Sequence, residues 1–266
     1  GAISTPTAGT SNVRLGVDAG DSIVSGANYN TLIGDEAGDS LVSGGVNNTA
    51  VGYQALTSED ANGNATAIGF RALGNQNAGA ESYNVAVGID AGLNLTLATS
   101  ATLVGAFAGG GAVMTGANNT AIGRNAGYVL TSGAENVFVG GLAGDGTDDG
   151  NFNTAVGYLA LSANCGSNNT AVGQRSLVSA TGDLNTSIGK EAGTLMSSGQ
   201  RCTFVGALAG SNASTMEDTV AVGNDAGKFA TTAHSSVFIG ADAGQGITGT
   251  KLTGNQNTAV GAQAGF

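Results

Sequence analysis

The stretch NNTAVGYQALTSEDANGNATAIGFRALG, residues 47–74, contains nearly the same phrase twice. NTAVG at 48–52 returns one period later as ATAIG at 65–69. Aligned on the glycine that ends this phrase, here called the corner glycine, the chain holds fifteen copies. Most spacings between successive corner glycines are close to 17, and the two longest precede Gly88 and Gly261. A period near 17 that persists from end to end predicts a solenoid.

The fold class predicted is therefore all-β, a parallel β-solenoid or β-roll of about fifteen rungs of about 17 residues each. The repeat leaves no domain boundary, so we expect residues 1–266 to form a single continuous solenoid domain. Because the chain begins at Gly1 without Met, we expect a fragment of a longer fibre. Asn opens the strand in ten copies, and stacked Asn side chains are expected to form a ladder.

The strand of each copy has three positions before the corner glycine. The two flanking columns hold Thr or Val at the first position and Val, Ile or Leu at the third, and the middle column lies between them. Successive strand residues face opposite sides, so both flanking columns share one face. Because the third position is aliphatic in every copy, the flanking columns are predicted to face the inside of the coil.

The middle column would then face outward, although only Arg14 and Ser187 in it are polar. A long apolar stripe on a solenoid is normally covered, and the economical cover is another copy of the chain. We therefore predict a homotrimer whose seam consists of Leu32, Ala50, Ala67, Ala86, Leu103, Ala121, Phe138, Ala155, Ala171, Phe204, Ala221, Phe238 and Ala259.

Composition excludes several classes of protein. The chain has 47 glycines, one proline and 10% charged residues, with a net charge of −11. Such an acidic excess argues against nucleic acid or an anionic membrane as the partner. No apolar run approaches the roughly 20 residues that a membrane-spanning helix needs, so no membrane insertion is expected.

The phrase NTAVGYxAL, at 48–56 and 153–161, resembles repeats in bacteriophage tail fibres and spikes. It is also similar to the head repeats of YadA-like trimeric autotransporter adhesins, whose period is nearer 14 and which carry stalk heptads and an anchor that this chain does not show. The resemblance covers all fifteen copies. It implies a trimeric fibre at a virion surface, or in an extracellular or cell-surface location, that attaches to a host-surface glycan or protein.

Residues that suggest chemistry are few. His234 is the only histidine and no G-x-S-x-G motif is present, so we expect neither an enzyme nor a cofactor. The acidic turn GDGTDDGN offers Asp145, Asp148 and Asp149 as candidate metal ligands, although an ordinary turn is favoured. Cys165 and Cys202 lie more than two rungs apart and are expected to be isolated thiols.

Aromatic side chains give the candidate receptor contacts Tyr53, Phe70 and Tyr158, since rings stack on sugars and anchor interfaces. Packing between neighbouring rungs is the favoured interpretation of the same residues. The function expected is a structural and adhesive surface fibre. The alternatives are an ice-binding β-solenoid, which would need the Thr column on the outside, and an autotransporter head domain.

Overall fold

The computed structural model describes residues 11–59, 61–246 and 252–265. The chain divides into two compact units, Gly1–Glu135 and Asn136–Phe266. All named elements in the described residues are three-residue β-strands, and tight turns separate them. That the repeat runs through the chain as one continuous domain stays a prediction.

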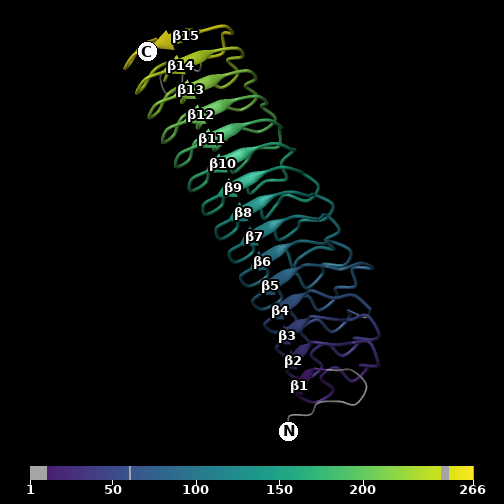
Figure 1. The fold of residues 1–266 in the computed structure, drawn as a ribbon. Helices are drawn as coiled ribbons and strands as arrows, with labels where there is room; N and C mark the ends of the chain where they lie inside the picture. Colours follow the sequence, from purple (N-terminus) through teal and green to yellow (C-terminus); the bar gives the residue numbers. More distant parts are fainter. Residues whose placement is uncertain (1–10, 60, 247–251, 266) are drawn as a thin grey trace. The chain divides into compact units, whose positions relative to one another are not determined.

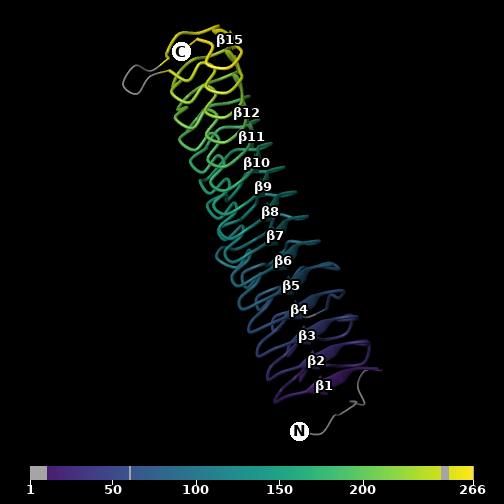
Figure 2. The ribbon, with the colours of Figure 1, turned by 90° about the vertical axis from the view of Figure 1, so that its left-hand side faces the viewer.

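The first unit holds seven strands that stack in sequence order along one side of the coils (Figure 1 and Figure 2). Each strand pairs in parallel with the next and in the same register, so that Thr49 lies opposite Thr66. The strands are β1 Val13–Leu15, β2 Thr31–Ile33, β3 Thr49–Val51, β4 Thr66–Ile68, β5 Val85–Val87, β6 Thr102–Val104 and β7 Thr120–Ile122.

The second unit repeats this arrangement with eight strands, again parallel and in register; Thr170 lies opposite Thr154 and Thr186. The strands are β8 Val137–Val139, β9 Thr154–Val156, β10 Thr170–Val172, β11 Thr186–Ile188, β12 Thr203–Val205, β13 Val220–Val222, β14 Val237–Ile239 and β15 Thr258–Val260. The predicted class, an all-β parallel solenoid whose rungs follow the period of the sequence repeat, is confirmed.

Hydrogen bonds between rungs run well beyond the strands. The Gly52 amide donates to the carbonyl of Ile33 in the preceding rung at 2.7 Å, and the Thr49 amide donates to Ala65 in the following rung at 2.9 Å. Around the corner, the Gln54 amide donates to Asp35 at 3.0 Å. Turn hydrogen bonds within a coil, such as Ala55 to Gly52 at 3.3 Å, satisfy some backbone groups, and stacking on the neighbouring rungs satisfies many of the others.

The predicted orientation of the strands was wrong. The middle column faces the inside of each coil, and both flanking columns face outward. Ala50, Ala171 and Phe204 are fully buried in the chain's own core. The correction applies to every residue assigned to the trimer seam, namely Leu32, Ala50, Ala67, Ala86, Leu103, Ala121, Phe138, Ala155, Ala171, Phe204, Ala221, Phe238 and Ala259.

The physical reason is the volume inside the coil. The buried residue three positions after the corner glycine is Ala in nearly every rung, and the residue after it is Gly or Leu. All four rungs with Leu there, including those of Leu56 and Leu161, have Ala in the middle column. All five rungs with Leu or Phe in the middle column have Gly instead. In these nine rungs one large side chain fills the space from one wall or the other. Where both residues are small, as at Ala86 and Gly92, side chains of the neighbouring rungs reach in. A Cβ on Gly92 would lie 2.8 Å from both Leu73 and Leu103.

The corner glycine is required by close contact between rungs. A Cβ added at Gly173 would lie 2.5 Å from the carbonyl oxygen of Gly189 in the next rung, and Gly52 would meet Gly69 at 2.4 Å. The φ angles at these two positions, +132° and +136°, are also outside the range that L side chains favour. The column is therefore glycine for two independent reasons.

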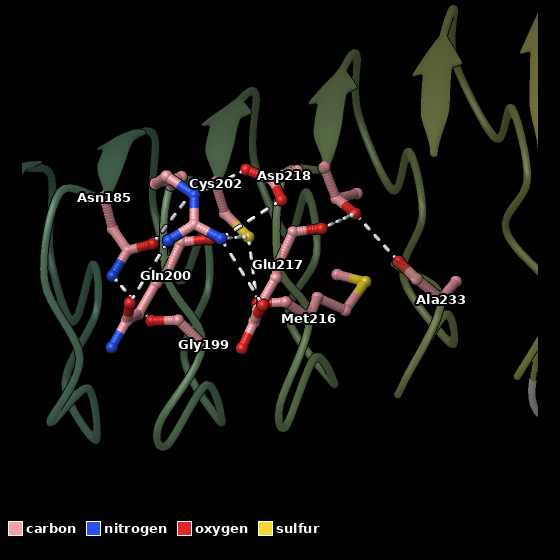
Figure 3. A network of polar contacts seen from close by, with 10 residues as sticks. Asn185, Gly199, Gln200, Cys202, Met216, Glu217, Asp218 and Ala233 are labelled. Atoms are coloured by element: carbon pink, nitrogen blue, oxygen red, sulfur yellow. Dashed lines mark hydrogen bonds and ion pairs between the residues drawn. The ribbon is translucent and has the colours of Figure 1, made fainter. Parts of the chain in front are cut away.

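The expected Asn ladder is confirmed. The side-chain oxygen of Asn30 accepts the backbone N–H of Asn48 at 2.9 Å, and the amide group of Asn30 donates to the Gly45 carbonyl at 2.7 Å. In the second unit Asn185 accepts from the backbone of Cys202, which takes the next ladder position (Figure 3). The Cys202 thiol lies 3.2 Å from the Met216 carbonyl, in place of the amide donor. The ladder closes the corner before each strand without exposing its backbone groups.

Candidate functional site

The outward face of the strands is the most extensive feature of the surface. It consists of the flanking columns, with Thr or Val in one and Val, Ile or Leu in the other. Nine of these aliphatic side chains are between 37% and 64% exposed: Val13, Leu15, Ile68 and Ile122 in the first unit, and Val137, Val156, Ile188, Ile239 and Val260 in the second. In each unit the flanking columns run parallel to the stack, and these residues are their more exposed members.

This face is regular because the register never slips. Val51 lies opposite Ile68, and Val156 lies opposite Val172, so in each unit both columns are rows of β-branched side chains, apart from Leu15. β-Branched residues have few rotamers, so the face is stiff and loses little entropy on contact. An ordered apolar row with a parallel row of hydroxyl and methyl groups suits contact with another ordered surface.

A second feature lies just past the corner glycines of β3 and β4. The rings of Tyr53 and Phe70 are stacked, with centroids 5.7 Å apart and planes at 29°. The two side chains are still 43% and 42% exposed. The pair therefore packs between rungs, as the favoured interpretation had it, and also presents ring surface to solvent.

Arg71 connects this aromatic pair to a pocket. Its guanidinium carbon lies 4.8 Å from the Phe70 ring centroid, within cation–π range. Its Nε and one terminal nitrogen donate to the two carboxylate oxygens of Asp90 at 2.8 and 3.0 Å. The hydrogen bond to Asp90 raises the pKa of Arg71 above its ordinary value, with desolvation opposing it. This bidentate contact fixes the orientation of the Arg71 guanidinium as well as pairing its charge.

The pocket beside Arg71 has a volume of about 240 Å³. Its other walls are formed mainly by Gln54, Thr57, Ser58, Asn75 and Leu93. This pocket was not predicted from the sequence, although the sequence carries a signal for it. Arg71 and Asp90 occupy the same column of adjacent rungs, as do Tyr53 and Phe70, so stacking alone brings each pair together.

The third candidate contact, Tyr158, does not join this group. It occupies the equivalent position after the corner glycine of β9 and is 50% exposed. The same column holds Gly141 and Gln174 in the adjacent rungs, so neither neighbouring rung offers Tyr158 a ring to stack on. The three aromatic candidates thus comprise one pair and one separate residue.

In the acidic turn after β8, the Asp148 and Asp149 side chains lie next to one another, and their interaction raises the pKa of Asp149. Asp145 accepts a 2.6 Å hydrogen bond from the Ser162 hydroxyl, whereas Asp148 accepts from the Asp149 backbone at 2.7 Å. Burial raises the pKa of Asp145, and the hydrogen bond from Ser162 lowers it. In the described part of the chain, no three His, Cys, Asp or Glu side chains are grouped so as to hold a metal ion. The contacts at this turn are those of an ordinary turn.

The two thiols are structural. Cys165 and Cys202 are both buried and free, as expected. Burial raises the pKa of each thiol from 9.0 to about 11. Since the thiolate is the reactive form, neither side chain is suited to nucleophilic chemistry.

Comparisons of the chain with protein-family models, curated proteins and solved structures found no match. Within the residues that the structure describes, no helix has the length and apolar character needed to cross a membrane. The outward strand face and the aromatic pair with its pocket are the two surfaces on which a functional argument can be built.

Proposed function

We propose that this chain is part of a structural and adhesive surface fibre, of the bacteriophage tail-fibre or spike type, that assembles as a parallel homotrimer. The chains meet through the flanking columns of the strands. The fibre carries surface sites for attachment to a host, at a virion or cell surface. It has no catalytic role and needs no cofactor.

The observation that supports assembly is the exposed strand face. Val, Ile or Leu occupies the third strand position of every rung, and in both units several of these side chains, such as Ile68 and Ile188, are about two fifths exposed. Burying apolar surface stabilises an assembly by about 25 cal/mol per Å², and a row repeated in every rung adds this contribution many times. Cyclic symmetry covers the face of every chain and leaves no unpaired copy. The choice of three chains rests on the resemblance to trimeric fibres and adhesin heads.

Assembly is tested by placing charges on the two faces of the same strands. Val156→Asp with Val205→Asp puts carboxylates on the outward face of β9 and β12. The matched control, Ala155→Asp with Phe204→Asp, puts them one residue earlier, inside the coil. The outward pair should keep the β-type circular dichroism of the wild type but reduce the mass from three times 25.6 kDa to 25.6 kDa. The inward pair should unfold the coil, because a buried unpaired charge costs several kcal/mol.

An outward pair that leaves a trimer intact, measured by light scattering, would place the assembly surface elsewhere. A wild-type chain that stays at 25.6 kDa at micromolar concentration would exclude the trimer itself.

A second candidate, ice binding, is favoured by one observation. The Thr column faces outward in regular register, for example Thr154 opposite Thr170 and Thr170 opposite Thr186. An outward Thr column exposes the aliphatic column as well, and in the structure both columns face outward. Val replaces Thr in five strands, which interrupts the hydroxyl row.

Thermal hysteresis separates the two candidates. A fibre whose strand face is covered by other copies should show none. A chain that is monomeric, depresses the freezing point below the melting point and loses this effect in the Val156→Asp, Val205→Asp variant would favour ice binding.

A further inference from the structure

We propose that the Tyr53–Phe70 ring pair and the adjoining pocket form a binding site for a neutral oligosaccharide, with one sugar ring in the pocket and the next against the aromatic surface. The biological role of this sugar site rests on the proposed function, in which the chain is part of an attachment fibre. The site lies on three adjacent rungs of the first unit of one chain and needs no other copy.

The shape of the site sets the size of the ligand. The pocket of about 240 Å³ is smaller than the roughly 300–1,000 Å³ typical of sites for drug-sized ligands. A pocket of this size suits a single sugar ring rather than a folded peptide or a nucleotide. Arg71 lies against the Phe70 ring and also lines the pocket, so the pocket and the ring surface are continuous.

The walls of the pocket set the chemistry. Thr57 and Ser58 carry hydroxyl groups, Gln54 and Asn75 carry amides, and Leu93 supplies an apolar patch. The Thr57 hydroxyl already donates to the Glu36 carbonyl at 3.1 Å, so its oxygen remains an acceptor. A ligand rich in hydroxyl groups, each both donor and acceptor, matches such a set of polar groups.

The exposed rings set the second contact. Tyr53 and Phe70 each expose more than two fifths of their surface while they are fixed by stacking on one another. Because Tyr53 is stacked on Phe70 and Arg71 lies over the Phe70 ring, the sugar contacts mainly the Tyr53 ring, which Phe70 supports. The face of an aromatic ring is negative, and it attracts the weakly positive C–H groups on the apolar side of a sugar ring. Because the rings are held in place before binding, little side-chain entropy is lost when the ligand arrives.

Charge around the site favours a neutral ligand over an acidic one. The positive charge of Arg71 is neutralised by two hydrogen bonds to Asp90. The Gln54 amide is held by Glu36 at 2.7 Å, which adds a further carboxylate nearby. The chain as a whole carries a net charge of −11. An anionic sugar would be repelled at long and short range.

The test is direct binding, by saturation-transfer NMR and then calorimetry, of three neutral probes: maltohexaose, cellohexaose and mannohexaose. At least one should bind, with saturation transferred to it from Tyr53 and Phe70. Tyr53→Ala and Phe70→Ala should each weaken binding about tenfold, the loss expected for one aromatic contact. Ala is tolerated at this position, since Ala106 and Ala207 occupy it in other rungs.

The matched control is Tyr158→Ala, which removes an exposed tyrosine from the same column, where neither adjacent rung holds a ring and which lies outside the lining of the Arg71 pocket. Its affinity should equal that of the wild type. The proposal is overturned if no neutral probe binds, if Tyr158→Ala weakens binding as much as Tyr53→Ala, or if a hyaluronan hexasaccharide binds more tightly than all three. Light scattering reports assembly separately, so loss of the trimer with sugar binding intact refutes only the fibre.

Discussion

Exchanging the large side chain between the two walls of one coil should separate the effect of volume from that of residue type. In the rung of β12, Phe204 fills the core and Gly210 stands opposite it. A Cβ on Gly210 would lie 2.5 Å from Cε1 of Phe204, so the two positions compete for one space. The rungs of β9 and β10 have the opposite arrangement, with Ala155 and Ala171 opposite leucines.

The single changes should both be costly. Phe204→Ala should destabilise the folded chain by about 3–5 kcal/mol, because it empties a fully buried site. Gly210→Leu should cost about 2–4 kcal/mol through overpacking and through a left-handed φ of +58°. In the double variant the new leucine occupies the volume of the lost ring, and only the backbone cost of about 1–2 kcal/mol remains.

The assay is urea unfolding followed by circular dichroism, with all four proteins at one concentration because assembly adds to stability. The double variant should be more stable than either single variant, with a coupling free energy of at least about 2 kcal/mol. Additive losses would mean that the two side chains do not share a space, and the account of the core would be wrong.

Three further outcomes are expected. Gly173→Ala should lower the free energy of unfolding in urea by at least about 3 kcal/mol, and clearly more than Gly261→Ala. Both positions have positive φ, but only at Gly173 would the new Cβ meet a carbonyl oxygen, that of Gly189 at 2.5 Å. Equal losses would leave backbone strain as the sole reason for the glycine. Ser187→Ala should stabilise the chain by about 1 kcal/mol, because the buried Ser187 hydroxyl has no hydrogen-bond partner within the described part of the chain. Ala is also the commonest residue of the middle column. A lower melting temperature for this variant would show that the hydroxyl has a partner. Folding raises the pKa of Cys202 from 9.0 to about 11, so the thiol's contribution to stability is complete below pH 9 and is lost as pH rises towards 11. At pH 8.5, iodoacetamide should label Cys202 far more slowly in the native protein than in urea. Equal labelling rates would contradict the burial of this thiol.

The sequence predicted the repeat, the corner glycine and the Asn ladder, because each depends only on a column being constant through stacking. It failed on the orientation of the strand, because both faces are apolar and period two alone cannot tell inside from outside. Constancy of Val and Ile does not mark burial here, because the narrow core selects Ala50 and its equivalents. The decisive signal was the exchange of volume between Phe204 and Gly210, or Ala155 and Leu161, which requires comparison of two columns.

The candidate site was predictable only in part. Tyr53 and Phe70 were identified as exposed aromatic residues in neighbouring rungs. Column position brings Arg71 to Asp90, but the pocket also depends on the path of the chain around Ser58 and Asn75, which column position does not determine. Loops of unequal length set these paths, and their packing is specific to each rung.

A distance measurement between identical positions tests the central claim most directly. Val172→Cys provides one site for a spin label on the outward face of β10. The native thiols are removed by Cys165→Ala and Cys202→Asn. Asn is chosen at position 202 because it is the usual residue of the ladder that Cys202 joins. In a parallel, in-register trimer the three labels lie at the same height around the axis. Because packed sheet faces lie about 10 Å apart, pulsed electron paramagnetic resonance should give a single narrow distance of about 10–20 Å. Absence of dipolar coupling, or a broad distribution beyond this range, would contradict assembly through the outward strand face.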